Sequence, residues 1–329
     1  AVFFNNRLTM DLSIYNKKTN DLIIDRPLDP STGYTSTQTN IGLIENKGAE
    51  LDLSMNWFES QDGLNWSSSF NWSTNDAIVI ELGEDTDRIV FAGFGTLGNA
   101  AIPGESLGSI IGSSITRLGG RIENSRWVDG GDYVVNNQGS YDETFDPTII
   151  GDANPDWIAN LSNTISYKNL SLNFLFNYQQ GGDIFTYTVA TLLGRGLTTD
   201  TLDRELSFVL PGVNSNGQPN TKMINNSTFY FSNVLYGPDE MLVYDASHWR
   251  LGEVSLSYNL PKNLIDSTPF GSISITASGF NLAYNAWNTP EGTNFDPNIA
   301  GVGIGNGRGF DFINGPSARR YGGSIKLTF

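Results

Sequence analysis

The chain has 329 residues, a formal net charge of −16 and no cysteine. A chain this acidic repels phosphate, which argues against binding of nucleic acid. The absence of cysteine excludes a disulfide framework and thiolate metal sites. Charged residues make up only 16% of the sequence, against roughly 25% in a typical soluble domain. Together with the frequent glycine, small polar and aromatic residues, this composition suits a wall with one face in lipid and one in water.

Taken in chain order, the predicted elements are β-strands, because apolar and polar residues alternate with a period of two. After Pro155, for example, Trp157 and Leu161 fall on one face while Asn160 and Ser162 fall on the other. The sequence contains no run of roughly 18 apolar residues, so it predicts no membrane-spanning helix. We predict about ten strands, which begin near residues 7, 44, 63, 105, 122, 157, 169, 246, 271 and 317.

The connections between these strands alternate in length. Short ones are expected near 59–63, 118–122, 168–170 and 260–271, and long ones near 19–43, 80–104, 131–155, 181–245 and 284–316. Several predicted strands reach the roughly ten residues that cross a bilayer, whereas soluble strands average about five or six. Short periplasmic turns and long extracellular loops are typical of outer-membrane barrels. The sequence therefore predicts an all-β fold, a transmembrane antiparallel β-barrel, rather than a β-sandwich or β-propeller.

Catalytic and metal-binding chemistry have little support in the sequence. His248 is the single histidine, and no Gly-x-Ser-x-Gly motif supplies a nucleophile for it. Zinc would need more histidine or cysteine ligands than the chain contains. The glycine-rich run 301–309 lacks the Lys-Ser/Thr ending of a phosphate-binding loop and is predicted to be a flexible loop. We therefore expect no enzyme activity, no catalytic or metal-ligating residue and no cofactor.

Five segments, in the same order along the chain, resemble motifs of the SusC/RagA family of TonB-dependent outer-membrane transporters. Residues 46–51 resemble its N-x-G-x-E motif, and residues 150–157 resemble "iGdpnPdw". Residues 249–261 resemble "vRLrevsLsYnlP", residues 278–282 resemble "sgrNL", and residues 316–329 resemble the final strand with its terminal aromatic residue.

The chain departs from the family pattern at three places. Residues 135–141 stand where the family often has an acidic D-x-N-G-D-G loop, so calcium binding is not expected there. Phe280 replaces the usual arginine of "sgrNL", and Asn298 replaces the acid of "G-x-D-P-E".

The resemblance implies a 22-stranded barrel with a plug domain in its lumen. Residues 1–329 would then be its C-terminal portion, and the plug domain and earlier strands would lie outside this chain. The lack of a signal peptide agrees with that expectation. The location implied is the bacterial outer membrane, in contact with lipid, and the oligomeric state stays open between a monomer and a dimer.

The function implied is TonB-dependent import of oligosaccharide or peptide nutrients, with TonB acting through the plug and a SusD-like surface lipoprotein as a lid. An alternative is a structural subunit of a larger outer-membrane assembly or secretion machine, since fold does not fix function. A third is a self-contained small barrel that acts as a pore or adhesin. Aromatic rings stack on sugar faces, so the candidate substrate-binding residues are the loop aromatics Trp127, Tyr133, Tyr141, Tyr284 and Trp287.

Overall fold

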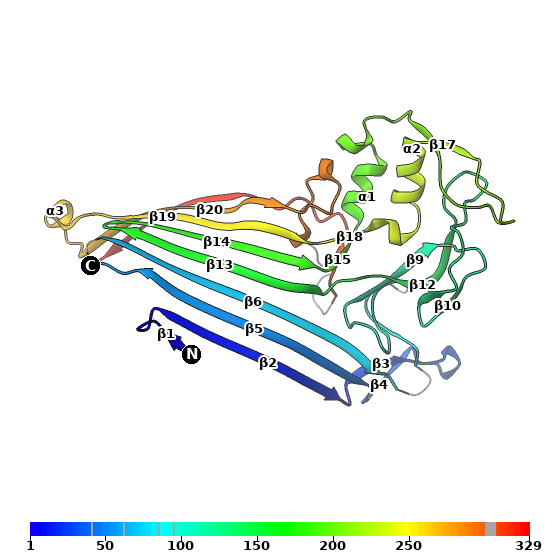
Figure 1. Cartoon of the computed structure of the whole chain (residues 1–329), viewed down its shortest axis with the longest axis horizontal. Coiled ribbons are helices and arrows are strands. Elements are labelled where there is room, and N and C mark those ends of the chain that lie inside the picture. The colour runs from blue at the N-terminus through cyan, green and yellow to red at the C-terminus, as the bar shows by residue number, and fades with distance from the viewer. Residues whose placement is uncertain (41, 62, 84–85, 95, 300–306) are drawn as a thin grey trace.

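The computed structural model describes residues 1–40, 42–61, 63–83, 86–94, 96–299 and 307–329. Its dominant feature is one antiparallel sheet of long strands that lie side by side along the molecule (Figure 1). In spatial order the strands are β1 (Val2–Phe3), β2 (Leu8–Asn20), β5 (Leu43–Phe58), β6 (Leu64–Glu81), β13 (Pro155–Tyr167), β14 (Leu170–Gly181), β19 (His248–Asn259), β20 (Ser272–Asn285) and β22 (Arg320–Thr328).

The alternation in the sequence becomes two chemically different faces of this sheet. Leu161 of β13 lies opposite Phe70 of β6 and Phe176 of β14. On the other face, Asn160 is paired with other asparagines across the same strands. Barrel walls in membranes place apolar side chains outward and polar side chains toward the lumen. We therefore name the leucine-rich face the outer face and the asparagine-rich face the lumenal face.

Aromatic side chains form two levels on the outer face. The level near the short turns contains Trp57, Trp66, Tyr167 and Tyr258, and the level at the opposite end contains Trp72, Trp157, Tyr178 and Trp249. On β13 the two levels are separated by ten residue steps, from Trp157 to Tyr167. At roughly 3.3 Å per residue and a tilt of about 40°, this separation spans about 25 Å, the height of the apolar band of a membrane barrel.

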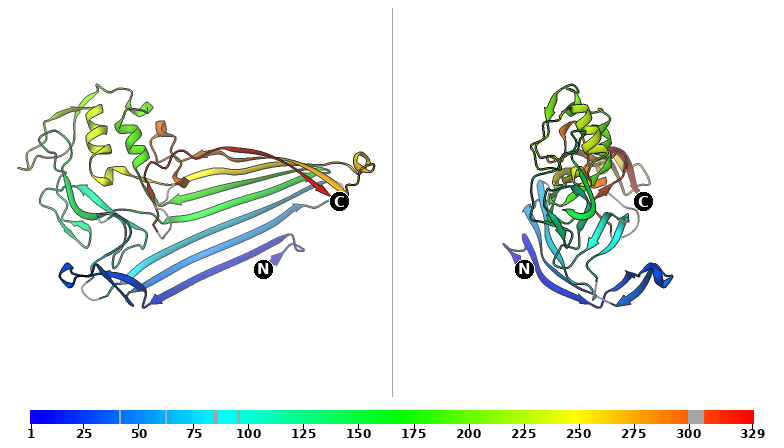
Figure 2. Two further views of the ribbon diagram at one scale, coloured as in Figure 1. Left: turned by 180° about the vertical axis from the view of Figure 1, so that it is seen from behind. Right: turned by 90° about the vertical axis from the view of Figure 1, so that its right-hand side faces the viewer.

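The connections at the two ends of the sheet differ as the sequence predicts. Residues 168–169 join β13 to β14 in a tight turn, and the short helix α3 (Lys262–Ile265) lies between β19 and β20. The long connections lie together at the opposite end, and the α3 turn and the C-terminus lie at the first end (Figures 1 and 2). Among the described residues, no helix is both long enough and apolar enough to cross a membrane.

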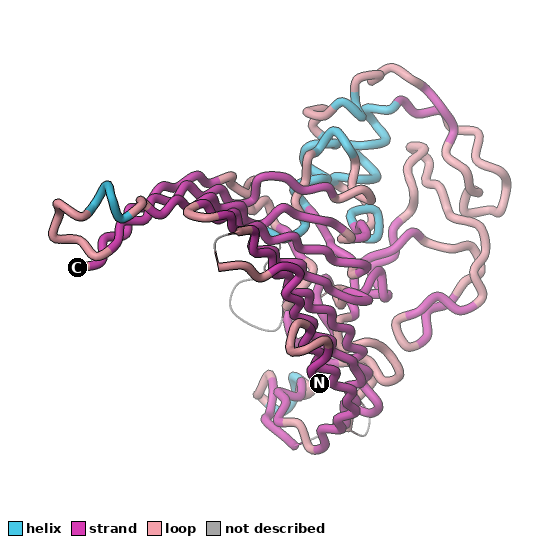
Figure 3. The backbone as a smooth tube through the Cα atoms, turned by 60° about the vertical axis from the view of Figure 1, so that its left-hand side comes forward, coloured by secondary structure: helices cyan, strands magenta, loops and turns pink. Residues whose placement is uncertain are grey.

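The long connections are folded rather than structureless. We name the structure formed by residues 82–154, 182–247 and 286–319 the cap (Figure 3). Its first sheet contains β7 (Ile89–Phe94), β8 (Leu97–Ala101), β9 (Ser109–Ile115) and β12 (Glu143–Asp152), and its second contains β15 (Asp183–Thr186), β18 (Val243–Asp245) and β21 (Phe310–Asp311). Its hairpins are β10–β11 (Arg121–Glu123, Arg126–Val128) and β16–β17 (Ser207–Val209, Met223–Asn225).

The helical elements of the cap come mainly from its second segment. They are α1 (Tyr187–Gly194), η2 (Thr199–Thr201), α2 (Asn226–Phe229), η3 (Tyr230–Leu235), η4 (Asp239–Leu242), η5 (Glu291–Thr293) and η6 (Pro297–Ile299). A separate hairpin of β3 (Ile23–Pro27) and β4 (Ser36–Asn40), with η1 (Pro30–Thr32) between them, connects β2 to β5.

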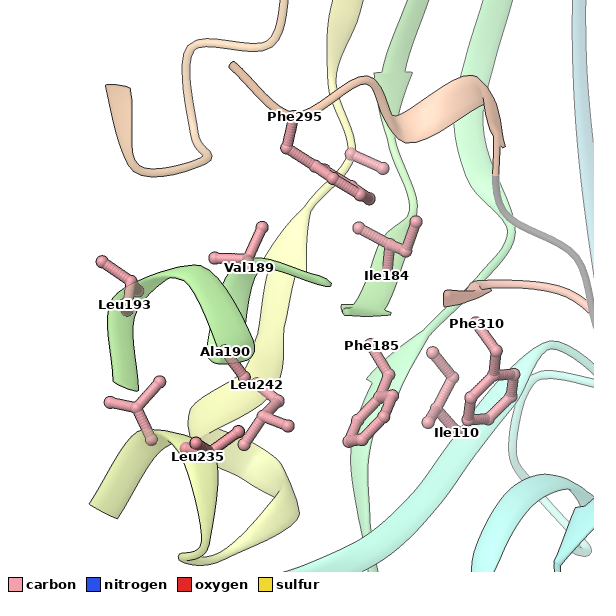
Figure 4. Packing of buried hydrophobic residues seen from close by; sticks show 12 residues of the cluster. Ile110, Ile184, Phe185, Val189, Ala190, Leu193, Leu235, Leu242, Phe295 and Phe310 are labelled. Carbon is pink, nitrogen blue, oxygen red and sulfur yellow. The ribbon is translucent and has the colours of Figure 1, made fainter. Parts of the chain in front are cut away.

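One apolar core holds the three segments of the cap together. Ile110 of β9, Phe185 of β15 and Phe310 of β21 are each buried, and each comes from a different segment (Figure 4). The rings of Phe185 and Phe310 are 5.9 Å apart. Helix α1 packs on this core through Val189 and Leu193. Because the core draws on all three segments, the cap is expected to fold as one unit.

Buried polar contacts fix the start of α1 against the third segment. Thr186 caps the helix by accepting a hydrogen bond from the Val189 N–H at 3.2 Å. The Asp311 carboxylate accepts from the Thr186 hydroxyl at 2.8 Å and from the Thr188 N–H at 3.0 Å. A carboxylate at a helix N-terminus satisfies free N–H groups and complements the helix dipole.

Eight of the strand predictions are confirmed as strands of the wall, and those near 105 and 122 are wrong as wall strands. The first region forms β9, which is buried on both faces inside the cap. The apolar residues of this strand belong to the core of the cap and not to the outer face of the wall. The second region forms the β10–β11 hairpin of the cap, so the short connection expected at 118–122 is not a turn of the wall. Of the glycine-rich run 301–309, residues 301–306 lie outside the described residues.

Candidate substrate-binding surface

Two of the five predicted aromatic residues lie against one arginine in the cap, and a third contacts one of these two. The Arg117 guanidinium lies 5.3 Å from the ring centre of Tyr133 and 6.0 Å from that of Trp127. Tyr133 meets Tyr141 edge to face, with 5.7 Å between the ring centres. The β10–β11 hairpin presents Trp127, whose Nε1 donates a hydrogen bond to the Ser114 hydroxyl at 2.9 Å. We name Arg117, Trp127, Tyr133 and Tyr141 the aromatic–arginine cluster.

This cluster has the chemistry to hold a polar ring. Tyr133 keeps 38% of its surface exposed, so part of this side chain remains accessible to a ligand. Burial, followed by the influence of Tyr133, raises the pKa of the Tyr141 hydroxyl, which therefore stays a protonated hydrogen-bond donor at neutral pH. Among the described residues, the buried Arg117 Nε has no hydrogen-bond partner. Stacking rings beside fixed donors are what a sugar or a peptide group requires.

Tyr284 and Trp287 lie apart from this cluster, at the cap end of β20. The Tyr284 hydroxyl donates to the Asn294 carbonyl, which leaves it occupied within the chain. The Trp287 ring lies 5.8 Å from Tyr178, which in turn stacks on Trp157 at 4.9 Å. Trp287 thus extends the aromatic level of the outer face that lies at the end opposite the short turns. Substrate binding by these two residues stays a prediction, and the geometry gives each of them another role.

A buried polar cluster that was not predicted joins three of the motif segments. Arg250 of β19 is 4% exposed and Asp296 is 2% exposed. The Arg250 guanidinium forms an ion pair with Asp296 and donates to the Asn281 amide oxygen at 3.0 Å. Its face lies 5.9 Å from the Tyr284 ring. These contacts fasten the segment after β20 to the lumenal side of β19.

The "iGdpnPdw" segment is fastened to the cap in a similar way. The Asp183 carboxylate accepts a hydrogen bond from the Asp152 N–H at 2.8 Å. A Cβ on Gly151 would lie only 2.9 Å from the Asp183 side chain, so glycine is needed for this approach. The segment 150–157 therefore meets β15, which is distant from it in sequence, where the wall passes into the cap.

A cavity of about 710 Å³, which we name the wall pocket, lies where β5 and β6 enter the cap. The wall strands contribute Asn46, Asn75 and Ala77, whose parity along β5 and β6 places them on the lumenal face. Among the described residues, the lining consists of Leu22, Ile23, Ile44, Asn46, Asn75, Ala77, Leu82, Ile89, Val90, Phe91, Asn99, Ala101, Leu107, Gly108, Asn154 and Arg308. Its volume falls in the range of about 300–1,000 Å³ that small ligands occupy.

Two partly buried carboxylates hold η4 against the edge of β9. The Asp239 carboxylate accepts from the Ser113 N–H at 2.9 Å, and the Glu240 carboxylate accepts from the Ile115 N–H at 3.0 Å. Burial raises the pKa of both carboxyls above their usual values, and these N–H donors oppose that effect. The contact connects the first and second segments of the cap.

We expect this contact to weaken as the pH rises. A carboxyl whose pKa is raised by folding contributes stability that is complete below its ordinary pKa of about 4 and is lost as the pH rises through the folded value. Hydrogen exchange of the β9 amides, corrected for intrinsic rates, should therefore show more protection at pH 5 than at pH 8. Asp239→Asn should reduce this difference, whereas Asp146→Asn at an exposed site of β12 should preserve it. Equal protection at both pH values would contradict the expectation.

His248 has no catalytic surroundings. It is 5% exposed, and its Nδ1 donates a hydrogen bond to the Ala246 carbonyl at 2.8 Å. Within the part of the chain that the structure describes, no group of three or more acidic or histidine side chains could hold a metal ion.

The sheet, its two chemically different faces and the cap have the architecture of a membrane β-barrel wall with folded loops at one end. No family model matches the chain. TonB-dependent receptor P3 of Formosa agariphila is 29% identical over 86% of this chain and 28% of its own length. TonB-dependent receptor P26 of the same organism is 28% identical over 100% of this chain and 33% of its own length. TonB-dependent receptor SusC of Bacteroides thetaiotaomicron is 26% identical over 52% of this chain.

Solved structures give the same fold. The RagAB peptide transporter matches 99% of this chain with a TM-score of 0.67 at 21% identity, and the chain covers 34% of it. The chain thus spans about a third, or less, of the proteins that it matches. These findings agree with the predicted resemblance: along most or all of its length the chain is similar to proteins named TonB-dependent receptors, and over about half of it to SusC.

Proposed function

We propose that this chain forms one side of a barrel that imports oligosaccharide or peptide nutrients across the outer membrane. The observation that carries the proposal is the folded cap, because it places open aromatic rings and a ligand-sized cavity above a membrane wall. The name of the RagAB structure, a peptide transporter, supports an import role for the same fold. The plug, the earlier strands and the contact with TonB belong to the same proposal.

We place the docking surface of a SusD-like lipoprotein lid on the second segment of the cap. Large apolar side chains are exposed there by between 41% and 79% of their surface; they are Leu197, Leu202, Leu206, Val209, Met223, Phe231 and Tyr236. Exposed apolar surface of this kind is typical of sites for protein partners. Arg195 adds a charge to it, since its guanidinium lies 5.8 Å from the Phe231 ring and donates to the Tyr236 hydroxyl at 3.0 Å.

Mass spectrometry of what co-purifies from gently solubilised native outer membranes tests the proposal. A SusD-like lipoprotein as the main partner is the expected result, and Leu202→Asp is expected to reduce its recovery. An exposed leucine outside the cap, Leu264→Asp in the α3 turn, is the matched control. Stoichiometric recovery with secretion or barrel-assembly components would contradict import and favour a structural subunit of a larger machine.

The aromatic–arginine cluster gives a second test. Tyr133→Ala removes a partly exposed aromatic ring, and we take the contribution of aromatic pairs, about 0.5–1.5 kcal/mol, as the scale of one stacking contact. We therefore expect a 3- to 10-fold weaker affinity for the imported ligand, measured by titration calorimetry on the purified receptor. Tyr34→Ala, an exposed tyrosine in the β3–β4 hairpin, should leave the affinity unchanged. An unchanged affinity in Tyr133→Ala would remove the cluster from the substrate path.

A further inference from the structure

The wall pocket is built from three parts of the chain that are far apart in sequence. Asn46 and Asn75 come from the lumenal face of β5 and β6, Asn99 comes from β8, and Arg308 comes from the segment before β21. The pairing of β6 with β13 ends at Ser73. Beyond that point the segment after β8 lies beside β6, because the Leu107 N–H donates to the Ala77 carbonyl at 2.8 Å. The pocket is therefore formed by the transition from wall to cap.

The charge of the described lining is unlike that of the whole chain. The chain has 35 acidic residues and 19 lysines and arginines. The described lining of the pocket contains no aspartate or glutamate, and its one charged residue is Arg308. An acidic surface repels anions in general, so a position whose described lining carries one cation and no acid favours a negatively charged ligand.

The backbone of Arg308 is held in place by a buried amide. The Arg308 N–H donates to the Asn99 side-chain oxygen at 2.9 Å, and the Asn99 amide donates to the Gly108 carbonyl at 3.4 Å. Asn99 is 1% exposed, so both of its contacts are shielded from water. The Arg308 side chain itself is exposed, and among the described residues no carboxylate forms an ion pair with it.

The amides of the pocket supply neutral hydrogen-bonding groups beside this cation. The Asn75 oxygen accepts from the Tyr15 hydroxyl at 3.0 Å, and its NH₂ group can donate to a ligand. The Asn154 amide donates to Ser106 at 3.1 Å, which leaves its oxygen as an acceptor. Ring hydroxyls and peptide groups each need both a donor and an acceptor.

We propose that the wall pocket binds a carboxylate-bearing substrate, with the carboxylate on Arg308 and the neutral hydrogen-bonding groups on the asparagines. Arginine is suited to this task because its planar guanidinium matches a carboxylate with two parallel hydrogen bonds. A uronate in an oligosaccharide and the C-terminus of a short peptide both present this chemistry. The inference rests on the proposed import function, for which it names the class of substrate.

Titration calorimetry on the receptor isolated from native outer membranes tests the pocket. The probes are trigalacturonate, its neutral counterpart maltotriose, triglycine and triglycine amide. We expect Arg308→Gln to weaken the binding of trigalacturonate or triglycine by about tenfold, since hydrogen bonds to charged groups contribute on this scale. Binding of the neutral probes should be weak and should not change. The control is Arg7→Gln, an exposed arginine between β1 and β2.

Dependence on Arg308 for trigalacturonate alone assigns the pocket to uronates, and dependence for triglycine alone assigns it to peptide termini. Either result supports carboxylate binding. Unchanged affinity for both acids in Arg308→Gln, or an equal loss for the neutral probes, would overturn the inference.

TonB-dependent uptake of the native nutrient is measured on the same variants. Uptake that persists while the acids bind independently of Arg308 rejects the pocket alone, whereas absent uptake in the wild type rejects the import function.

Discussion

Leu161→Arg is expected to destabilise the barrel by about 2–4 kcal/mol, whereas Ser162→Arg is expected to cost much less. Leu161 lies on the outer face of β13, between Phe70 and Phe176, and 39% of its surface is exposed. It is also about midway between Trp157 and Tyr167, which mark the two aromatic levels on this strand. An arginine there would meet hydrocarbon near the bilayer midplane, where its charge is most costly.

Ser162 is the matched control because it is the next residue on the same strand and points to the lumenal face. Both variants receive the same side chain at nearly the same depth, so only the face differs. Refolding into lipid vesicles at a series of urea concentrations, read by heat-modifiable mobility in gels, gives the difference in free energy. Equal costs for the two variants would contradict our assignment of the faces.

The wall could be predicted from the sequence because its determinant is local. In a strand such as β14, apolar Leu172 and Phe174 alternate with polar Ser171 and Asn173, and each residue's face depends only on its parity. Side chains of one parity meet hydrocarbon along the whole strand, so the pattern is long and regular. The terminal strand β22 could be predicted for the same reason.

The cap could not be predicted because its core is assembled from distant residues. Ile110, Phe185 and Phe310 pack together although each lies in a different connection. A short strand such as β9 is buried on both faces, so its apolar residues have no solvent side to alternate with. Periodicity therefore placed this strand in the wall, when its partners β8 and β12 are in the cap.

The aromatic part of the candidate site could be proposed from residue type, but its centre could not. Trp127, Tyr133 and Tyr141 suit stacking wherever they lie in a loop, whereas nothing around Arg117 in the sequence indicates that it joins them. For the buried ion pair, the sequence did contain a signal, because both of its residues lie in segments that resemble family motifs. Arg250 lies within the segment that resembles the family's "RL" motif, and Asp296 lies within the "G-x-D-P-E" segment. Their partnership emerges only from the fold.

Asp296→Leu is expected to release the segment 286–299 from the wall, at a cost of about 3–5 kcal/mol. Removing the acid leaves the guanidinium of Arg250 buried and without its ion-pair partner. It also removes the acceptor for the Asn298 N–H, which donates to the Asp296 carboxylate at 3.1 Å. Hydrogen exchange in this segment should rise accordingly, while protection in the wall strand β14 should not change.

The double variant Arg250→Met/Asp296→Leu separates the cost of an unpaired charge from the cost of lost packing. Replacing both members of a buried ion pair with apolar residues is often neutral, because no charge is then left without a partner. We therefore expect the double variant to recover most of the protection that Asp296→Leu loses. If the double variant exchanges as fast as the single one, lost packing and not the unpaired Arg250 explains the release. If the single variant exchanges like the wild type, the ion pair does not hold this segment in place, and contacts such as that of the Tyr284 hydroxyl with the Asn294 carbonyl must do so instead.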